Sequence, residues 1–211
     1  MRVGFLTSFL AATLLLPGCA SITTEPLPAG LTNQPPAERA DLVSQLTRFS
    51  DWQLQGKLAV RQPEDSATAV INQWRQRGEH YQLVLSSAFL GMGRTELEGI
   101  PGFLELTMPD GETYRSSQPQ QLIEAATGWT FPVNALVWWV RGLAVPGEDA
   151  RLLFNKDRRL AVLNQAGWEI RYDAWHPFVD GQPHLPSRIT ALKGEKRLRL
   201  VITGWQSRNE S

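Results

Sequence analysis

The sequence is poor in the residues that most catalytic and metal sites need. It has one cysteine, Cys19, and three scattered histidines, so it offers neither metal-ligand spacing nor a disulfide framework. We find no glycine-rich phosphate loop and no serine–histidine–acid motif at a recognisable spacing. Glu96 and Glu98 point the same way from one predicted strand, as on an ordinary solvated strand face. We therefore predict no enzymatic activity, no catalytic residues, no metal and no cofactor.

The chain also lacks an excess of either charge. It has 21 basic and 21 acidic residues, a formal net charge of +0. Proteins that bind nucleic acid carry a strong basic excess, so we predict no nucleic-acid partner and a monomeric protein. Two basic clusters, at 156–159 and 193–199, fit solvated strand faces or turns. A specific acidic partner for them is the alternative.

No apolar run reaches the length of about 20 residues that spans a bilayer, but the N-terminus has a shorter one. Residues 1–18 combine Arg2 with an apolar run and a final small residue, the layout of a secretory signal peptide that is cleaved. The sequence Leu-Pro-Gly-Cys at 16–19 resembles the lipobox of bacterial lipoproteins, whose cysteine is lipidated. Lipidation would explain the lone thiol of Cys19 in an exported chain. A chance cysteine near a cleaved signal is the alternative.

The residues after the lipobox predict where the protein resides. Ala20, in place of aspartate, resembles the sorting pattern of outer-membrane lipoproteins. Acyl chains on Cys19 would form an effectively permanent anchor, since each buried methylene contributes about 0.8 kcal/mol. We therefore expect a lipid-anchored protein at the periplasmic face of the outer membrane. Residues 19–36 are rich in proline and small polar residues, which predicts a flexible tether.

Residues 37–206 predict a single, mainly β domain, followed by a polar tail at 207–211. Alternating polar and apolar residues indicate about eleven consecutive antiparallel strands, which we expect to form an open, unclosed β-barrel. Helices are expected at 37–46, 118–126 and 132–142. The last begins with proline, ends with glycine and is apolar nearly all round. We expect a three-helix lid over an apolar cavity.

The chain is rich in tryptophan, with eight residues of this type. Aromatic and leucine side chains suit a concave site that binds apolar ligands through contact area. The residues expected to line the cavity and bind acyl chains are Trp52, Leu54, Leu58, Leu83, Leu85, Leu122, Leu136, Trp139, Trp168 and Ile170. Each of these, taken singly, is also compatible with an ordinary core position.

The connection between the strands predicted at 81–85 and 95–98 is unusually apolar. Surface loops normally carry Asn, Asp and Gly, but this one contains Phe89, Leu90 and Met92. An apolar tip must be covered by the protein's own core, by a partner or by a membrane. The predicted anchor favours a membrane-insertion loop.

Several stretches together resemble one family, LolB, the outer-membrane receptors for lipoproteins. The likeness covers the whole chain, and it lies in the order of the stretches: the signal and lipobox, 51–59, the apolar loop with 95–97, 132–142, 167–172 and 185–189. The resemblance implies an open barrel with a helical lid and a loop leucine that passes lipoproteins into the membrane. Leu90 matches that leucine. The typical Pro-Leu-Gly is Phe-Leu-Gly here, followed by Met92 and Gly93.

The resemblance predicts a lipoprotein that accepts other lipoproteins from a periplasmic carrier of the LolA type into its cavity. It would then insert them into the inner leaflet of the outer membrane. Its partners would be that carrier, lipoprotein acyl chains and outer-membrane lipid. Two alternatives stay open: a carrier that only holds a small hydrophobic molecule, and a scaffold lipoprotein that grips a protein partner in envelope assembly.

Overall fold

The computed structural model describes residues 26–87 and 93–207. These residues form eleven strands and three helices. The strands are β1 (Trp52–Arg61), β2 (Ser66–Arg77), β3 (His80–Ser87), β4 (Gly93–Ile100), β5 (Phe103–Thr107), β6 (Thr113–Ser116), β7 (Ala150–Phe154), β8 (Leu160–Gln165), β9 (Trp168–His176), β10 (Leu185–Lys193) and β11 (Lys196–Ser207). The helices are α1 (Arg39–Arg48), α2 (Pro119–Thr127) and α3 (Val133–Trp139).

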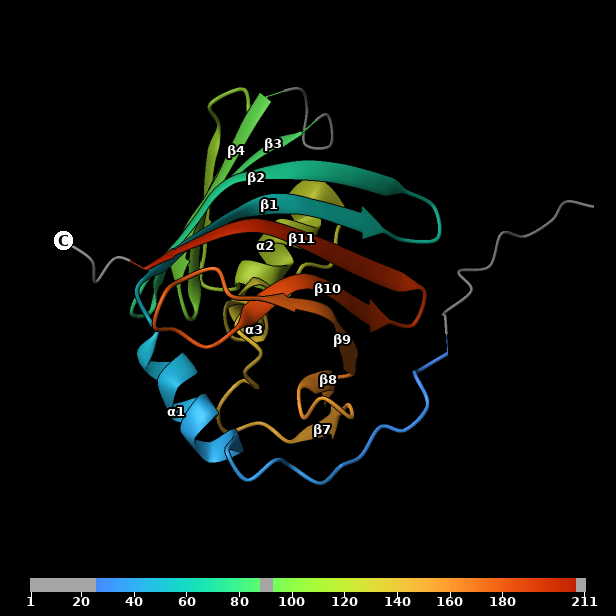
Figure 1. Ribbon diagram of the computed structural model, residues 1–211. Coiled ribbons are helices and arrows are strands. Elements are labelled where there is room, and N and C mark those ends of the chain that lie inside the picture. The colour runs from blue at the N-terminus through green and yellow to red at the C-terminus, as the bar shows by residue number, and fades with distance from the viewer. Residues whose placement is uncertain (1–25, 88–92, 208–211) are drawn as a thin grey trace, which may run out of the picture.

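All the strands belong to one antiparallel sheet, in the order β6-β5-β4-β3-β2-β1-β11-β10-β9-β8-β7. Strands that follow one another in sequence pair with each other, except that β6 and β7 do not pair and form the two edges of the sheet. The first and last strands, β1 and β11, pair along their length and join the two halves. The sheet is therefore a barrel left open where α2 and α3 interrupt the run of strands, and Figure 1 shows it curving round these two helices. The predicted open antiparallel fold is confirmed.

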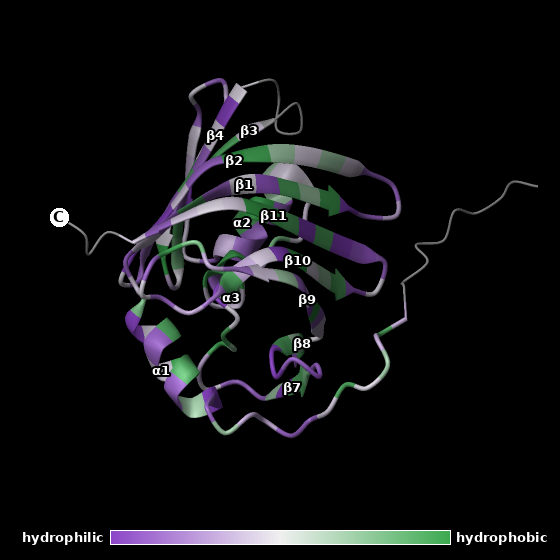
Figure 2. Cartoon of the chain, in the orientation of Figure 1, coloured by the Kyte–Doolittle hydropathy of each residue, from purple (hydrophilic) through white to green (hydrophobic). Residues whose placement is uncertain are grey.

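The period-two pattern of the strands sorts side chains between the core and the solvent. In β1, Trp52, Leu54 and Leu58 are buried and alternate with more exposed residues, and Figure 2 shows hydrophobic and hydrophilic bands alternating along β1 and β2. The sheet bends at Gly56, where the β1–β11 register shifts. A Cβ atom there would lie 2.2 Å from the carbonyl oxygen of Val201. Only glycine fits this close approach of two backbones.

The helices lie close to their predicted positions. α2 ends at Gly128, which adopts the left-handed conformation with φ 72°, as glycine readily does after a helix. The third helix was predicted over 132–142 but ends at Trp139. It is shorter because Gly142 turns the chain at φ 78° against the ring of Trp175, and Leu143 N–H donates back to the Trp138 carbonyl.

The described part of the expected tether contacts the domain. Thr32 exchanges two backbone hydrogen bonds with Phe154 at the end of edge strand β7, at 3.0 and 2.8 Å. The expected tether is thus fastened to the domain at Thr32, and this contact covers part of an otherwise free sheet edge. Across the described ranges, the helices are all too short or too polar to cross a membrane.

Candidate functional site

An apolar pocket lies between the concave face of the sheet and α2. Its sheet wall consists of Leu58 and Val60 from β1, Leu85 from β3, Leu97 from β4 and Leu106 from β5. Its other wall consists of Ile123, Thr127, Trp129 and Phe131. The pocket has a free volume of about 30 Å³, which is room for no more than a water molecule or two. The two walls are nearly in contact, so an acyl chain fits only if they separate.

The structure brings two of the ten predicted cavity residues, Leu58 and Leu85, into this pocket. Seven others are buried elsewhere in the core: Trp52, Leu54, Leu83, Leu136, Trp139, Trp168 and Ile170. Leu122 is partly buried against that core, and its neighbour Ile123 is the α2 residue that faces the pocket. The sequence prediction missed Trp129 and Phe131, because the irregular stretch after α2 has no periodicity that could mark their inner face.

Hydrogen bonds from two side chains of the sheet side hold the stretch after α2. Gln62, in the β1–β2 turn, donates to the carbonyl of Gly128 at 2.9 Å. Lys196, at the start of β11, donates to the hydroxyl of Thr130 at 2.5 Å. The helix itself contacts β5 and the short edge strand β6. This side of the lid therefore rests mainly on apolar contact.

The α3 region is fastened more tightly, chiefly by the buried side chain of Gln165 at the end of β8. Its Oε1 accepts from the indole N–H of Trp139 at 3.0 Å and from Val145 N–H at 2.9 Å. Its Nε2 donates to the Val145 carbonyl at 3.0 Å. The hydroxyl of Tyr172 donates to the Trp139 carbonyl at 3.0 Å. These bonds join the end of α3 to β8 and β9.

A buried arginine joins α3 to α1. Arg141 is 3% exposed and donates to the main-chain carbonyls of Leu46, Phe49 and Val137 at 3.1, 3.0 and 3.2 Å. Its guanidinium carbon lies 4.9 Å from the ring centroid of Trp138. Burial away from water lowers the pKa of Arg141 to about 10. The arginine binds the carbonyls at the end of α1, where a cation is favourable.

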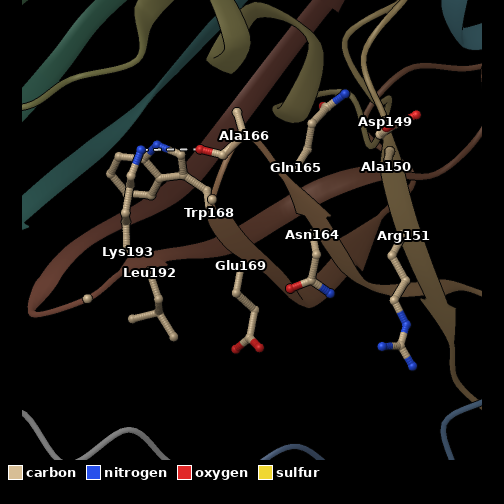
Figure 3. A pocket seen from close by; sticks show the side chains of 12 residues that line it. Asp149, Ala150, Arg151, Asn164, Gln165, Ala166, Trp168, Glu169, Leu192 and Lys193 are labelled. Atoms are coloured by element: carbon tan, nitrogen blue, oxygen red, sulfur yellow. Dashed lines mark hydrogen bonds between the residues drawn. The ribbon is translucent and has the colours of Figure 1, made fainter.

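A second, polar groove lies over the ends of β7–β10. Arg151, Asn164 and Glu169 form a cross-strand row, and Figure 3 shows their side chains pointing the same way while Gln165 points to the opposite side. The Lys193 ammonium, which donates to the Ala166 carbonyl at 3.2 Å, borders the same groove. This open and charged surface suits no acyl chain.

The remaining predicted site residues lie outside the described ranges. These are the lipidation site Cys19 and the loop residues Phe89, Leu90 and Met92. In the described part of the chain, no cluster of three or more His, Cys, Asp or Glu residues could hold a metal ion.

The carboxylates singled out in the sequence have partners on the surface. Glu96 forms an ion pair with Arg94 at 2.9 Å, and Glu98 Oε1 lies within hydrogen-bond distance of His80 Nε2, at 3.0 Å. His80 is the first residue of β3, and the other three residues belong to β4.

Fold and pocket together define an open β-barrel protein with an apolar site between its sheet and a lid helix. The sequence model of the family described as "Outer membrane lipoprotein LolB" matches residues 50–205. The "Outer-membrane lipoprotein LolB" of Marinobacter nauticus is 61% identical over 189 residues, 90% of this chain and 91% of that one. Its namesake from Pseudomonas syringae is 35% identical over 195 residues, 92% of each chain. The chain therefore belongs to the LolB family, as its sequence predicted.

A solved structure of a DUF1329 family protein from Desulfovibrio piger shares the fold. It superposes with a TM-score of 0.52 at 8% identity and covers 84% of this chain and 95% of its own. At this identity the likeness concerns the fold alone.

Proposed function

We propose that this protein is an outer-membrane lipoprotein that accepts lipoproteins from a periplasmic carrier and inserts them into the inner leaflet of the outer membrane. Family membership and the signal with its lipobox support the proposal. The observation that carries it is the apolar pocket, whose walls belong to two separate elements, the sheet and the α2 region. Such a pocket can open to take an acyl chain and close again when the chain leaves.

The energetics of lipid transfer require a protein of this kind. A lipoprotein with three chains of about sixteen carbons would expose each chain to water at a cost of roughly 12 kcal/mol, at about 0.8 kcal/mol per methylene. A barrier above roughly 30 kcal/mol gives essentially no release on a cellular timescale. Transfer between two apolar walls in contact avoids most of this barrier, since each methylene leaves one wall as it meets the next.

The acyl chains enter by displacing α2 and the stretch up to Phe131 from the sheet. Side-chain hydrogen bonds from Gln62 and Lys196 hold this stretch to the strands. The α3 region, by contrast, is held by Gln165 and Arg141 at several points. α3 is therefore the fixed part of the lid and α2 the part that moves. No nucleotide is needed if successive sites bind the chains more tightly.

The loop with Phe89, Leu90 and Met92 enters the membrane and delivers the chains, while lipidated Cys19 keeps the domain at the surface. Both roles rest on the sequence. The β3–β4 hairpin that carries this loop also provides Leu85 and Leu97 to the pocket wall. A chain that leaves the pocket along this hairpin is thus led toward the loop.

A two-step transfer assay tests the proposal, from loaded carrier to this protein and from this protein to liposomes. Leu90→Glu should block delivery to liposomes, because a charge in the hydrocarbon region is costly, and should leave acceptance from the carrier intact. Val70→Glu is the matched control, since Val70 is an apolar residue on β2 that is 44% exposed, and it should transfer normally.

Two results would contradict parts of the proposal. Delivery by Leu90→Glu at the wild-type rate would show that the loop has no insertion role. A wild-type protein that accepts no lipoprotein would not be a receptor. Binding of a fluorescent fatty acid without passage to liposomes would favour a small-ligand carrier, and no binding at all would favour a scaffold.

A further inference from the structure

Three arginines line one groove on the outer face of the sheet, where β1 ends and β11 begins. They are Arg61, Arg197 and Arg199, and the groove has a volume of about 380 Å³. Val60 and Leu198, which alternate with them along the two strands, are buried in the core. Because side chains alternate between the faces of a sheet, the arginines point outward, away from the apolar pocket.

The strand register holds the three cations together. Arg61 lies directly opposite Arg197 in the β1–β11 pair, and Arg199 is two positions further along β11 on the same face. Directly opposite side chains have Cβ atoms about 4.5–5.5 Å apart, and like charges at this spacing destabilise a sheet. A bound anion between the arginines would relieve this repulsion.

The neighbouring residues do not offset the positive charge. Leu192 and Thr190, which lie opposite Arg197 and Arg199 on β10, are uncharged. The β1–β2 and β10–β11 turns contain acidic residues, but in the described part of the chain none of them forms an ion pair with the three arginines. The groove is therefore open to an anionic ligand.

The other residues of the groove indicate which anion it suits. Across β1 and β2, Arg61 pairs with Ser66 and Ala59 pairs with Thr68, and these short side chains line the groove beside the long arginines. Guanidinium groups and hydroxyls are donors that suit phosphate oxygens. Carboxylates, which would repel a phosphate, are absent from the described residues that line the groove.

The position of the groove indicates the source of the phosphate, and this step rests on the proposed function. The β1–β2 and β10–β11 turns, which flank the groove, lie on the same side of the barrel (Figure 1). β3 runs toward this side, because His80 at its start pairs with Arg77 while Ser86 pairs with Val70, nearer the β1–β2 turn. The apolar loop that follows β3 thus begins on the side of the barrel that carries the groove.

A loop that enters the membrane from this side brings the groove close to the lipid headgroups. We propose that the groove binds the phosphate of anionic phospholipids in the membrane that the loop enters. Each basic residue near an anionic lipid surface strengthens binding about fivefold. The loop and the groove make two separate contacts with the membrane, and together they fix the orientation of the barrel, which the loop alone would leave free to rotate.

Vesicle flotation tests the site on the mature chain from residue 19, with Cys19→Ala to remove the acyl anchor. This protein should bind vesicles of three parts phosphatidylcholine to one part phosphatidylglycerol at least tenfold more tightly than phosphatidylcholine alone, and salt should weaken the preference. Arg61→Gln and Arg199→Gln should each reduce it about fivefold. Arg77→Gln is the matched control, since it removes the same charge from the exposed far end of β2, and it should retain the preference.

The arginine variants should fold normally, because each removes a repelled surface charge, so their melting temperatures should not fall. Equal binding of the unsubstituted groove to both kinds of vesicle would overturn the proposal, and so would a preference retained in both arginine variants. Inorganic phosphate distinguishes the source of the ligand. A melting temperature that phosphate raises, that sodium chloride of equal ionic strength does not raise, and that no longer responds in Arg199→Gln would assign the groove to a soluble phosphate and refute the lipid assignment.

The two-step transfer assay distinguishes the membrane from an acidic partner protein. Arg199→Gln should slow delivery to liposomes that contain phosphatidylglycerol several-fold and leave acceptance from the carrier unchanged. Slower acceptance with unchanged vesicle binding would make the carrier the occupant of the groove and refute the lipid assignment. If the wild-type protein accepts no lipoprotein but keeps its preference for anionic vesicles, the proposed function fails and the lipid site stands.

Discussion

Arg141 offers the sharpest test of how the lid is held. Arg141→Met replaces the guanidinium with an unbranched apolar side chain and removes all three of its hydrogen bonds to main-chain carbonyls. The carbonyls of Leu46 and Phe49, at the end of α1, would lose a buried donor. We expect the variant to be less stable because, of the buried side-chain hydrogen bonds between α1 and the end of α3, it would keep the one from Arg39 to the Gly142 carbonyl but lose those of Arg141.

Two opposing contributions set the magnitude. Hydrogen bonds from a charged donor contribute about 1.5–3 kcal/mol each, so the loss of three costs roughly 5–9 kcal/mol. Burial of the charge opposes this, since it lowers the pKa of Arg141 from its usual range to about 10. At about 1.36 kcal/mol per pKa unit, methionine relieves a cost on the order of 3 kcal/mol. The expected net loss of stability is therefore about 2–6 kcal/mol.

Urea unfolding measures this loss. With a slope of about 2 kcal/mol per molar urea, the midpoint of Arg141→Met should fall by about 1–3 M. Arg115→Met is the control, because the Arg115 side chain is 63% exposed in a surface ion pair, and its midpoint should hardly move. A midpoint for Arg141→Met at or above that of the wild type would refute the reasoning, since it would mean that burial of the cation costs more than its hydrogen bonds contribute.

Three further changes test other contacts. Gln165→Leu leaves the Trp139 indole and a main-chain pair without partners and should lower the free energy of unfolding by about 2–4 kcal/mol in urea. Burial raises the pKa of Tyr81 above its ordinary 10.0. The contribution of Tyr81 to stability is therefore fully present below pH 10 and is lost as the pH rises further. Between pH 10 and 11.5, the free energy of unfolding in urea should fall less in Tyr81→Phe than in the wild-type protein. Thr32→Pro removes one donor to Phe154 and should speed hydrogen exchange at the Phe154 amide; unchanged exchange would show that the contact does not persist in solution.

Much of the fold was predictable because strand patterning is local. Alternation along β1 marks Trp52, Leu54 and Leu58 as inner residues from the sequence alone, and all three are buried. The pocket lining was harder to predict, because it depends on the rotation of one helix. Leu122 and Ile123 are adjacent, about 100° apart around α2, and packing against the sheet decides which of them faces the pocket.

The inward orientation of Gln76 was hidden by a bulge. In β2 the register shifts between Ile71 and Gln73, so the inner face changes from odd to even positions. Ala69 and Ile71 are buried before the shift, and Trp74 and Gln76 after it. A strict period of two read from the first half of the strand places Gln76 outside. The inner position of Gln76 arises from the bulge, which the residue pattern does not reveal.

The opening in the barrel supports the proposed movement of the lid, in which α2 separates from the sheet and α3 stays in place. Had β6 paired with β7, the sheet would have closed on itself, and its interior would have been filled by side chains packed at fixed density. The helices instead occupy the gap in the run of strands, and they are attached differently. α3 is bonded to β8, β9 and the end of α1 by buried polar groups, whose separation would leave them unpaired. α2 rests by apolar contact beside the edge strand β6, and an acyl chain can replace that contact with one of the same kind. Volume for a ligand is therefore created most easily at α2.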